Sequence, residues 1–239
     1  MIIILMFVSA ICVFLSVMFT KTSAARILLT AISGIIFVGS TVIMTGNYNL
    51  HWGMHQVTTT NTQQIYSASN SSMPLALYQP VGKSGKDDVY IYNTKVRQKK
   101  PNHTQANEYT HNQMKRTNGT KAQLITKETR WRYNGELDRV LFAWTDMDGT
   151  LVKRTNTFQY PHAYVKVSTQ QAKKLAQAAK SSHNKQAQAA MQQKAKAYVS
   201  AQVKAAMTKN PKMSSSQIQD VTKRAEMQFQ SQMIKQMLQ

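Results

Sequence analysis

The sequence predicts a membrane-anchored α+β protein with a two-helix transmembrane hairpin, a small antiparallel all-β domain and a basic helical tail. Three observations lead to this fold class. Two long apolar runs begin the chain, short runs rich in β-branched and aromatic residues follow, and the C-terminal part consists mainly of Ala, Gln and Lys. The corresponding domains are residues 1–45, 46–168 and 169–239.

Both apolar runs are long enough to cross a membrane. Residues Ile2 to Phe19 and Ile27 to Thr45 contain no charged side chain, and a helix needs roughly 20 apolar residues to span the hydrocarbon core. We therefore predict two spans, joined by Thr20 to Arg26. A cleaved signal peptide is the alternative for the first run, but no Lys or Arg precedes that run and a second span follows it closely.

Small residues predict where the two spans contact each other. Ser9, Cys12 and Ser16 form a stripe on the first span. We expect this stripe to face the region from Gly34 to Gly39, because small side chains let helices approach closely in lipid. Cys12 is also the only cysteine, so the domain after the spans has no disulfide and must be held by packing.

The distribution of positive charge predicts the orientation of the hairpin. Lys21 and Arg26 lie in the loop between the spans, whereas residues 46–82 contain neither Lys nor Arg. Positive charges near the ends of spans are retained in the cytoplasm. We therefore predict a multi-pass plasma-membrane protein in which everything after Thr45 is extracellular.

Residues 55–168 have the composition of a β-domain. Short runs of Val, Ile, Thr, Tyr, Phe and Trp are separated by turn residues such as Asn134-Gly135 and Asp148-Gly149. The simplest topology is an antiparallel meander, closed as a barrel or sandwich. The predicted strands are Val57 to Tyr66, Leu75 to Val81, Val89 to Asn93, Ala122 to Tyr133, Arg139 to Thr145, Leu151 to Phe158 and Ala163 to Ser168.

Two polar segments differ from this pattern. Residues 95–121 are rich in Asn and Lys and lack apolar periodicity, which predicts a long exposed loop. In the tail, Ser168 with Gln171 predicts a capping box that opens a helix extending to about Lys209. After Asn210-Pro211, Ser214 with Gln217 predicts the cap of a second helix. Its apolar face consists of Ile218, Val221, Ala225, Phe229, Met233 and Met237.

One motif suggests chemistry. Residues Asp146 to Leu151 (DMDGTL) resemble the nucleophile motif of the haloacid dehalogenase superfamily of phosphatases. The resemblance implies an aspartyl nucleophile, a magnesium site with later acidic ligands and a parallel α/β sheet. Only two acids follow the motif, Asp220 and Glu226, and both lie in the tail. The alternative that we favour is a β-hairpin turn between the strands ending at Thr145 and beginning at Leu151.

No other arrangement supports catalysis or a bound cofactor. His51 and His55 have the spacing of two metal ligands on one helix face, but no third ligand is evident. An interfacial role beside Trp52 is the better interpretation. We predict no catalytic residue, no cofactor and no metal.

The net charge indicates anionic partners. The chain contains 30 Lys and Arg against 10 Asp and Glu, a formal charge of +20, which creates a field of several kT at the surface. Outside a cell the partners would be anionic wall polymer, lipid head groups or an acidic protein, and nucleic acid is disfavoured there. For any single lysine, a solvated surface is the alternative. The candidate anion-binding residues are Lys95, Arg97, Lys99, Lys100, Lys173 and Lys174.

Five short segments are distinctive: Leu77 to Gly82, Val89 to Tyr92, Lys99 to Thr104, Glu128 to Trp131 and Leu151 to Phe158. Together they resemble an uncharacterised family of small two-span membrane proteins from lactic-acid bacteria, classified as a domain of unknown function. The resemblance covers roughly residues 1–175 and does not extend to the tail. It implies a Gram-positive plasma membrane and assigns neither an activity nor functional residues.

These observations predict an uncharacterised, non-enzymatic cell-envelope protein whose basic outer domain contacts anionic wall polymer or lipid. The first alternative is an accessory subunit of a membrane complex, which binds a protein partner through the C-terminal amphipathic helix. The second alternative is a phosphatase that uses Asp146 and Asp148.

Overall fold

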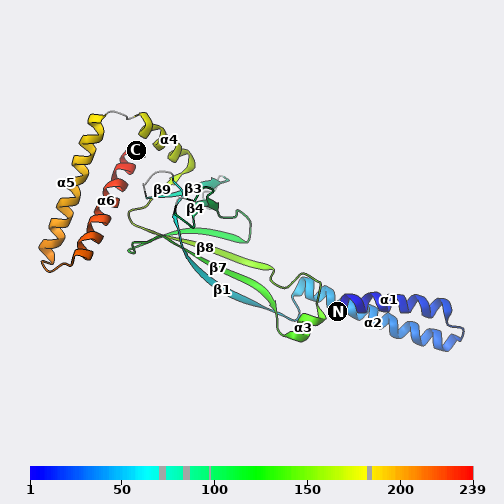
Figure 1. The fold of residues 1–239 in the computed structure, drawn as a ribbon. Helices are drawn as coiled ribbons and strands as arrows, with labels where there is room; N and C mark the ends of the chain where they lie inside the picture. The colour runs from blue at the N-terminus through cyan, green and yellow to red at the C-terminus, as the bar shows by residue number, and fades with distance from the viewer. Residues whose placement is uncertain (70–73, 83–86, 97, 182–184, 239) are drawn as a thin grey trace. The chain divides into compact units, whose positions relative to one another are not determined.

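A computed structural model describes residues 1–69, 74–82, 87–96, 98–181 and 185–238 (Figure 1). The chain forms two compact units, and each contains two segments of the sequence. We call Met1–Thr59 with Glu128–Arg154 the hairpin unit, and Thr60–Lys127 with Thr155–Gln239 the sheet unit.

The hairpin unit begins with helices α1 (Ile2–Phe19) and α2 (Ser23–Leu50). Both are long and apolar enough to cross a membrane. Three residues join them rather than the predicted seven, and α2 continues five residues past the predicted end at Thr45. The extra residues, Gly46 to Leu50, are less apolar, and hydropathy reports the apolar span rather than the hydrogen-bonded helix.

Small hydroxyl side chains lie between α1 and α2. Ser9, Ser16 and Ser40 are buried, and the hydroxyl oxygens of Ser16 and Thr30 are 2.7 Å apart. Cys12, the third member of the predicted stripe, is exposed. Serine hydroxyls can bond across a helix pair in lipid, so two of the three predicted positions face the partner helix.

A short helix, α3 (Glu136–Leu141), stands where the sequence predicted a strand from Arg139 to Thr145. That prediction was wrong because it followed composition rather than periodicity. Leu137, Val140 and Leu141 have the i, i+3, i+4 spacing of one helix face. The Asp138 carbonyl accepts a hydrogen bond from the backbone N–H of Phe142 and so closes the last turn of the helix.

Three long strands contribute residues to both units: β1 (Met54–Gln64), β7 (Gln123–Tyr133) and β8 (Leu151–Pro161). With β6 (Thr110–Thr117) they form a sheet in the order β1-β7-β8-β6. A second sheet has the order β2-β4-β3-β9, and β5 pairs with β4. Its strands are β2 (Tyr66–Ser67), β3 (Leu75–Val81), β4 (Asp87–Asn93), β5 (Asn102–His103) and β9 (Val165–Ser168).

The second sheet is mixed, which corrects the predicted all-antiparallel meander. Strand β3 pairs antiparallel with β4 but parallel with β9, with Leu75 opposite Val165 and Leu77 opposite Val167. A parallel pair requires a long connection between its strands. Here the whole segment from β4 to β8 provides that connection, and local sequence patterns do not reveal it.

The predicted long loop at residues 95–121 contains strands β5 and β6. Polar side chains mark β6 as a partner of β8: Gln113 donates to Thr157, and Asn112 accepts from Asn156. Met114 packs against the main core. A strand whose outward residues are mostly amides and charges has little apolar alternation, so the sequence pattern missed it.

Two cores lie on opposite faces of the second sheet, because side chains alternate along each strand. Ala76 and Tyr90 point to the first core, where the Tyr90 and Phe158 rings stack with centroids 4.6 Å apart. Leu75 and Leu77 point to the second core. The other buried members of the first core are Ile65, Ala122, Leu124 and Tyr160, and those of the second are Val165, Val167, Leu175 and Ile234.

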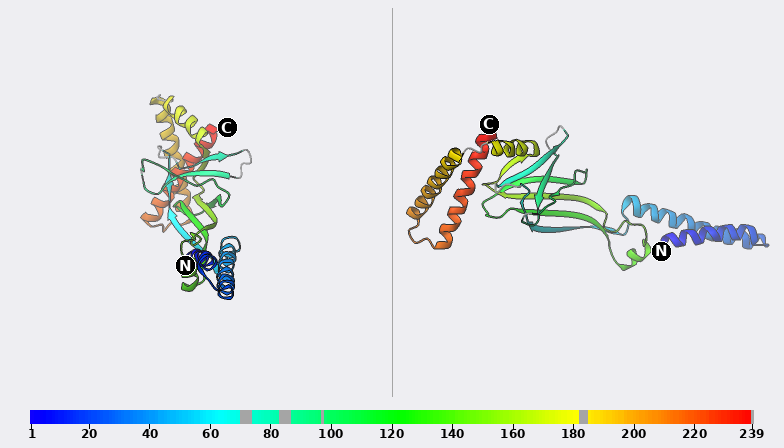
Figure 2. Two further views of the ribbon diagram at one scale, coloured as in Figure 1. Left: turned by 90° about the vertical axis from the view of Figure 1, so that its right-hand side faces the viewer. Right: turned by 45° about the horizontal axis from the view of Figure 1, so that its top comes forward.

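The tail forms three helices, α4 (Thr169–Ser181), α5 (Lys185–Lys209) and α6 (Ser215–Leu238), and the right-hand view of Figure 2 shows α5 beside α6. Both predicted capping boxes are present. Ser168 and Gln171 exchange hydrogen bonds of 2.9 and 3.2 Å, and Ser214 and Gln217 exchange bonds of 2.9 and 3.3 Å. The sequence predicted one helix where the structure has α4 and α5.

Candidate functional site

The two units differ sharply in charge. The sheet unit contains 23 Lys and Arg against 5 acids, whereas the hairpin unit contains 7 against 5. Two of the seven, Lys21 and Arg26, lie at the closed end of the helical hairpin, so the remainder of that unit is neutral. The excess positive charge of the protein therefore belongs almost entirely to the sheet unit.

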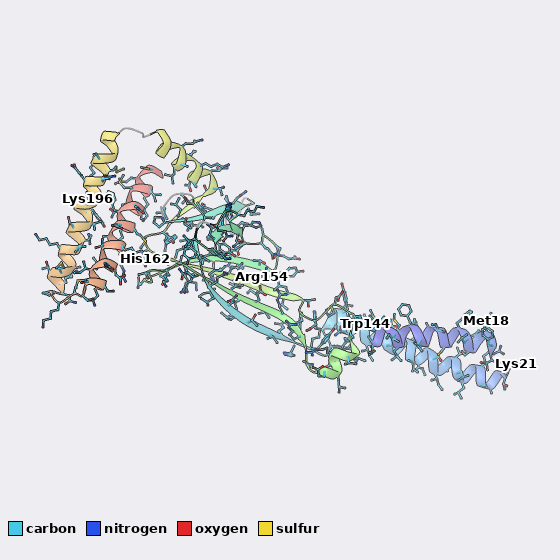
Figure 3. All side chains as sticks on the ribbon, viewed as in Figure 1. Met18, Lys21, Trp144, Arg154, His162 and Lys196 are labelled. Atoms are coloured by element: carbon cyan, nitrogen blue, oxygen red, sulfur yellow. The ribbon has the colours of Figure 1, made fainter. Side chains whose placement is uncertain are left out.

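Helices α4 and α5 carry positive charge that no acidic residue in the same segment offsets. Residues 169–209 contain eight lysines and no acid. The lysines with described side chains are all exposed, and none of them forms an ion pair within the described part of the chain. They are Lys173, Lys174, Lys194, Lys196, Lys204 and Lys209. We call this set the lysine surface; Figure 3 labels Lys196 on α5.

Apolar contacts hold these helices in place. Leu175 fixes α4 in the second core. Ile234 of α6 enters the same core. Helix α5 packs on α6, where the rings of Tyr198 and Phe229 are 5.7 Å apart. Apolar residues thus make these contacts, while the lysine side chains remain exposed to solvent.

Three of the other predicted anion-binding residues lie on a small turn after β4. The Gln98 side-chain oxygen accepts hydrogen bonds from the backbone N–H groups of Thr94 and Lys95, and its amide donates to the Lys100 carbonyl at 2.6 Å. Lys95, Lys99 and Lys100 are exposed on this turn. Arg97 lies outside the described residues. No hydrogen bond or ion pair described in the structure joins this turn to Lys173 or Lys174.

The DMDGTL motif forms a turn between α3 and β8, not the predicted hairpin between two strands. The Asp148 carboxylate is 3.2 Å from the Arg132 guanidinium, and Arg130 donates to the Gly149 carbonyl at 2.8 Å. Among the described residues, no three His, Cys, Asp or Glu side chains gather as a metal site. The arginines of β7 therefore hold Asp148 and Gly149 in this turn.

The two predicted histidines occupy separate positions beside β7. His51 ends α2 in the left-handed conformation, and its ring stacks on Trp131 with centroids 4.0 Å apart. The His55 ring nitrogen Nδ1 lies 3.0 Å from the Asn134 side-chain oxygen. Each ring thus has a local structural partner within the hairpin unit.

A charged cluster that the sequence analysis missed lies on β7 and β8. Glu128 accepts from the Nε atoms of Arg130 at 2.9 Å and Arg154 at 2.7 Å. Partial burial alone raises the pKa of Glu128, but these hydrogen bonds and charges outweigh burial and hold it below its usual value. The alternation of Glu128 and Arg130 along one predicted strand was the available signal.

A second missed pair lies in the sheet unit. The Lys166 ammonium is 2.6 Å from the Asp88 carboxylate and 4.3 Å from the centre of the Tyr78 ring. Burial lowers the pKa of Lys166, but the hydrogen bond to Asp88 and the neighbouring Tyr90 raise it overall. Lys166 is thereby committed to internal contacts, which distinguishes it from the lysine surface.

The sheet unit also has an open cleft of about 350 Å³ beside β6, whose lining includes Glu108, Thr110 and His111. The buried Thr110 hydroxyl has no hydrogen-bond partner within the described part of the chain. Glu108 and His111 are exposed. This set lacks the concentrated positive charge found on α4 and α5.

A comparison with known protein families identifies the family of this chain. A model described as Domain of unknown function (DUF4811) matches residues 22–175, well over half of the sequence. The chain belongs to this family. The DUF4811 region includes Lys95, Lys173 and Lys174, and it ends at Leu175 in the second core. Helices α5 and α6 lie beyond the match. No curated protein and no solved structure matches the chain.

Proposed function

We propose that this DUF4811 protein is a non-enzymatic, membrane-anchored protein that holds an anionic polymer or lipid surface through its lysine surface. One observation carries the proposal: eight lysines and no acid occur on α4 and α5. Lysine is the point charge that proteins use against phosphate groups. The turn with Lys95, Lys99 and Lys100 adds exposed charge in the same unit.

The membrane part of the proposal is supported by α1 and α2. We propose that they span the plasma membrane of a Gram-positive lactic-acid bacterium, with Lys21 and Arg26 in the cytoplasm and the sheet unit outside. The two helices are apolar, and these two residues are the only charged ones before Lys83. Wall polymers and lipid head groups are the anions available at that location.

Attraction of this kind depends on salt. The sheet unit has a net charge of +18, and an exposed charge is screened beyond about 8 Å at physiological ionic strength. Binding must therefore come from lysines close to the polymer. A contact through α4 and α5 consequently predicts that position, as well as total charge, controls affinity.

Salt elution from immobilised poly(glycerol phosphate) tests this prediction. The test variant replaces Lys173, Lys174, Lys194 and Lys196 with Gln. The control variant replaces four exposed lysines elsewhere with Gln, and both variants lose the same charge. The control residues are Lys115, Lys121, Lys127 and Lys153.

The test variant should elute at clearly lower salt than the control. Equal shifts of the elution salt concentration in the two variants would show that only net charge matters. Retention that does not depend on salt concentration would contradict the proposal. Phosphatidylglycerol vesicles in place of the polymer distinguish a lipid surface from a wall polymer.

Thiol labelling of intact cells tests the proposed orientation. Single cysteines at Thr22 and Ser200 in a Cys12→Ser background report the hairpin loop and α5. An impermeant reagent should label Ser200→Cys on intact cells and Thr22→Cys only after lysis. The reverse pattern would place the sheet unit in the cytoplasm and contradict the envelope function.

The accessory-subunit alternative uses the apolar face of α6. In this chain Phe229 of that face contacts Tyr198 of α5, and Ala225 is buried. A protein partner would have to displace α5 from that face. The lysine surface, in contrast, is already exposed, and for this reason we propose an anion-binding function.

A further inference from the structure

Helix α3 and the turn after it present an apolar stripe outward. Leu137, Val140 and Leu141 lie on one face of α3, and Trp144 follows in the turn after the helix. Their exposed fractions are 88%, 51%, 37% and 67%, respectively. A soluble surface rarely gathers four such side chains in eight residues.

The opposite side of the same segment is anchored to the hairpin unit. Phe142 is buried and its ring stacks on Tyr133, with centroids 5.9 Å apart. Met147 is buried as well. Between them Trp144 adopts a φ of 71°, a conformation that large side chains rarely take. The chain thus points Phe142 and Met147 inward and Trp144 outward.

The apolar stripe of α3 lies beside the N-terminal end of α1. The Met1 nitrogen is 2.9 Å from the carbonyl oxygens of both Val140 and Leu141. Figure 3 shows Trp144 at this end of the hairpin and Met18 and Lys21 at the other. Because α1 is an apolar span, α3 lies where the span meets the membrane surface.

The end of α2 reaches the same level. The hydroxyl contact between Ser16 and Thr30 sets the two helices in register. The stretch from Ser16 back to Ile2 on α1 has the same number of residues as the stretch from Thr30 on to Met44 on α2. At 1.5 Å per residue each stretch is roughly 21 Å long, so Met44 lies level with Ile2. The last turn of α2, Gly46 to Leu50, therefore extends past the start of α1. It presents exposed Tyr48 and Leu50, and Trp52 follows.

We infer that α3 and the aromatic residues around it lie in the interfacial zone of the bilayer, among the head groups and upper acyl chains. The inference rests on the proposed insertion of α1 and α2. Trp and Tyr are enriched at this depth, and an amphipathic helix there buries its apolar face by about 5–10 Å. The occupant of the stripe is lipid because the stripe continues the exposed apolar surface of the two spans.

Charge supports this placement. Glu136 and Arg139 lie off the stripe and pair with each other at 2.7 Å. The second segment of the hairpin unit, Glu128–Arg154, has five basic and five acidic residues. The segment that meets the membrane is therefore electrically balanced, and its attachment should be independent of anionic lipid.

Fluorescence quenching in vesicles tests the inference. Single cysteines at Leu137, Phe14 and Ser200 in a Cys12→Ser background are labelled with bimane in the full-length protein. The protein is reconstituted in phosphatidylcholine, which is zwitterionic and does not attract the lysine surface. Nitroxides on the head group or deep in the acyl chain report depth. A second probe at Trp144 checks the result at Leu137.

Leu137→Cys and Trp144→Cys should be quenched more by the shallow nitroxide than by the deep one. Phe14→Cys should be quenched most by the deep nitroxide, and Ser200→Cys by neither. Unquenched probes at Leu137 and Trp144, with Phe14→Cys quenched, would overturn the inference while leaving the anchor intact and the stripe free for a protein partner. An unquenched Phe14→Cys would reject the membrane anchor itself and the inference with it.

Discussion

Replacing Glu128 with Gln should destabilise the hairpin unit by about 2 kcal/mol. Glu128 is 23% exposed and lies between Arg130 and Arg154, which are 34% and 19% exposed. The substitution leaves two neighbouring guanidinium groups without their carboxylate. A hydrogen bond to a charged group contributes about 1.5–3 kcal/mol, and removing one partner of a fully buried ion pair costs about 3–5 kcal/mol. Partial exposure reduces the estimate to the lower end of these ranges.

The natural control is Glu136→Gln in the same unit. The pair of Glu136 with Arg139 has the same chemistry and a distance of 2.7 Å, but both side chains are mostly exposed. Such a surface pair contributes at most about 1 kcal/mol. All three tryptophans, Trp52, Trp131 and Trp144, lie in the hairpin unit. Their fluorescence during urea unfolding in detergent micelles therefore reports the unit that contains both substitutions.

The pH dependence has a definite sign. The pKa of Glu128 is lowered in the folded protein, so its stabilising contribution is complete above the unfolded value of about 4.3 and disappears as the pH falls through the lowered pKa. The difference between wild type and Glu128→Gln should be largest at neutral pH and should shrink in acid. A stability difference that does not change with pH, or that equals the difference for Glu136→Gln, would refute the reasoning.

Three further predictions concern packing and capping. A Cβ on Gly46 would lie 2.3 Å from the Trp52 ring, whereas a Cβ on Gly39 would have no atom within 4 Å. Gly46→Ala should therefore shift the tryptophan emission and lower the free energy of unfolding by about 1–3 kcal/mol. Gly39→Ala is the neutral control. Phe158 is 0% exposed in the first core, so Phe158→Ala should cost about 3–5 kcal/mol in thermal unfolding, and a loss below about 1 kcal/mol would contradict the packing. Ser168→Ala removes the cap of α4 and should cost about 1 kcal/mol; circular dichroism during heating measures the loss, and rescue by Ser168→Thr is expected.

Local patterns predicted the elements that depend on neighbouring residues. The two apolar helices, the strands around Leu75 to Val81 and Val89 to Asn93, and both capping boxes follow from runs and spacings within about ten residues. The structure confirms each of them, with shifts of a few residues at the ends. Element ends shift because the final turns depend on caps and tertiary contacts rather than on composition.

The candidate site was predicted only in part. The excess of lysine in the tail is visible in the sequence, and Lys173 and Lys174 are indeed exposed on one helix. The equally exposed lysines of α5 were not singled out, because a uniform Ala, Gln and Lys composition does not show which face packs. The pair of Lys166 with Asp88 was also missed, since these residues are 78 positions apart and meet only through β4, β3 and β9.

The sequence by itself determined the apolar hairpin, the class of each strongly patterned segment and the positive charge of the tail. Tertiary structure alone decided that β9 lies parallel to β3, that residues 110–117 form a strand, and that α3 presents Leu137 and Trp144 outward. The physical reason is the distance along the chain between the residues that interact. Helix caps and apolar runs act between near neighbours, whereas strand pairing and the choice of buried face are settled by contacts between distant segments.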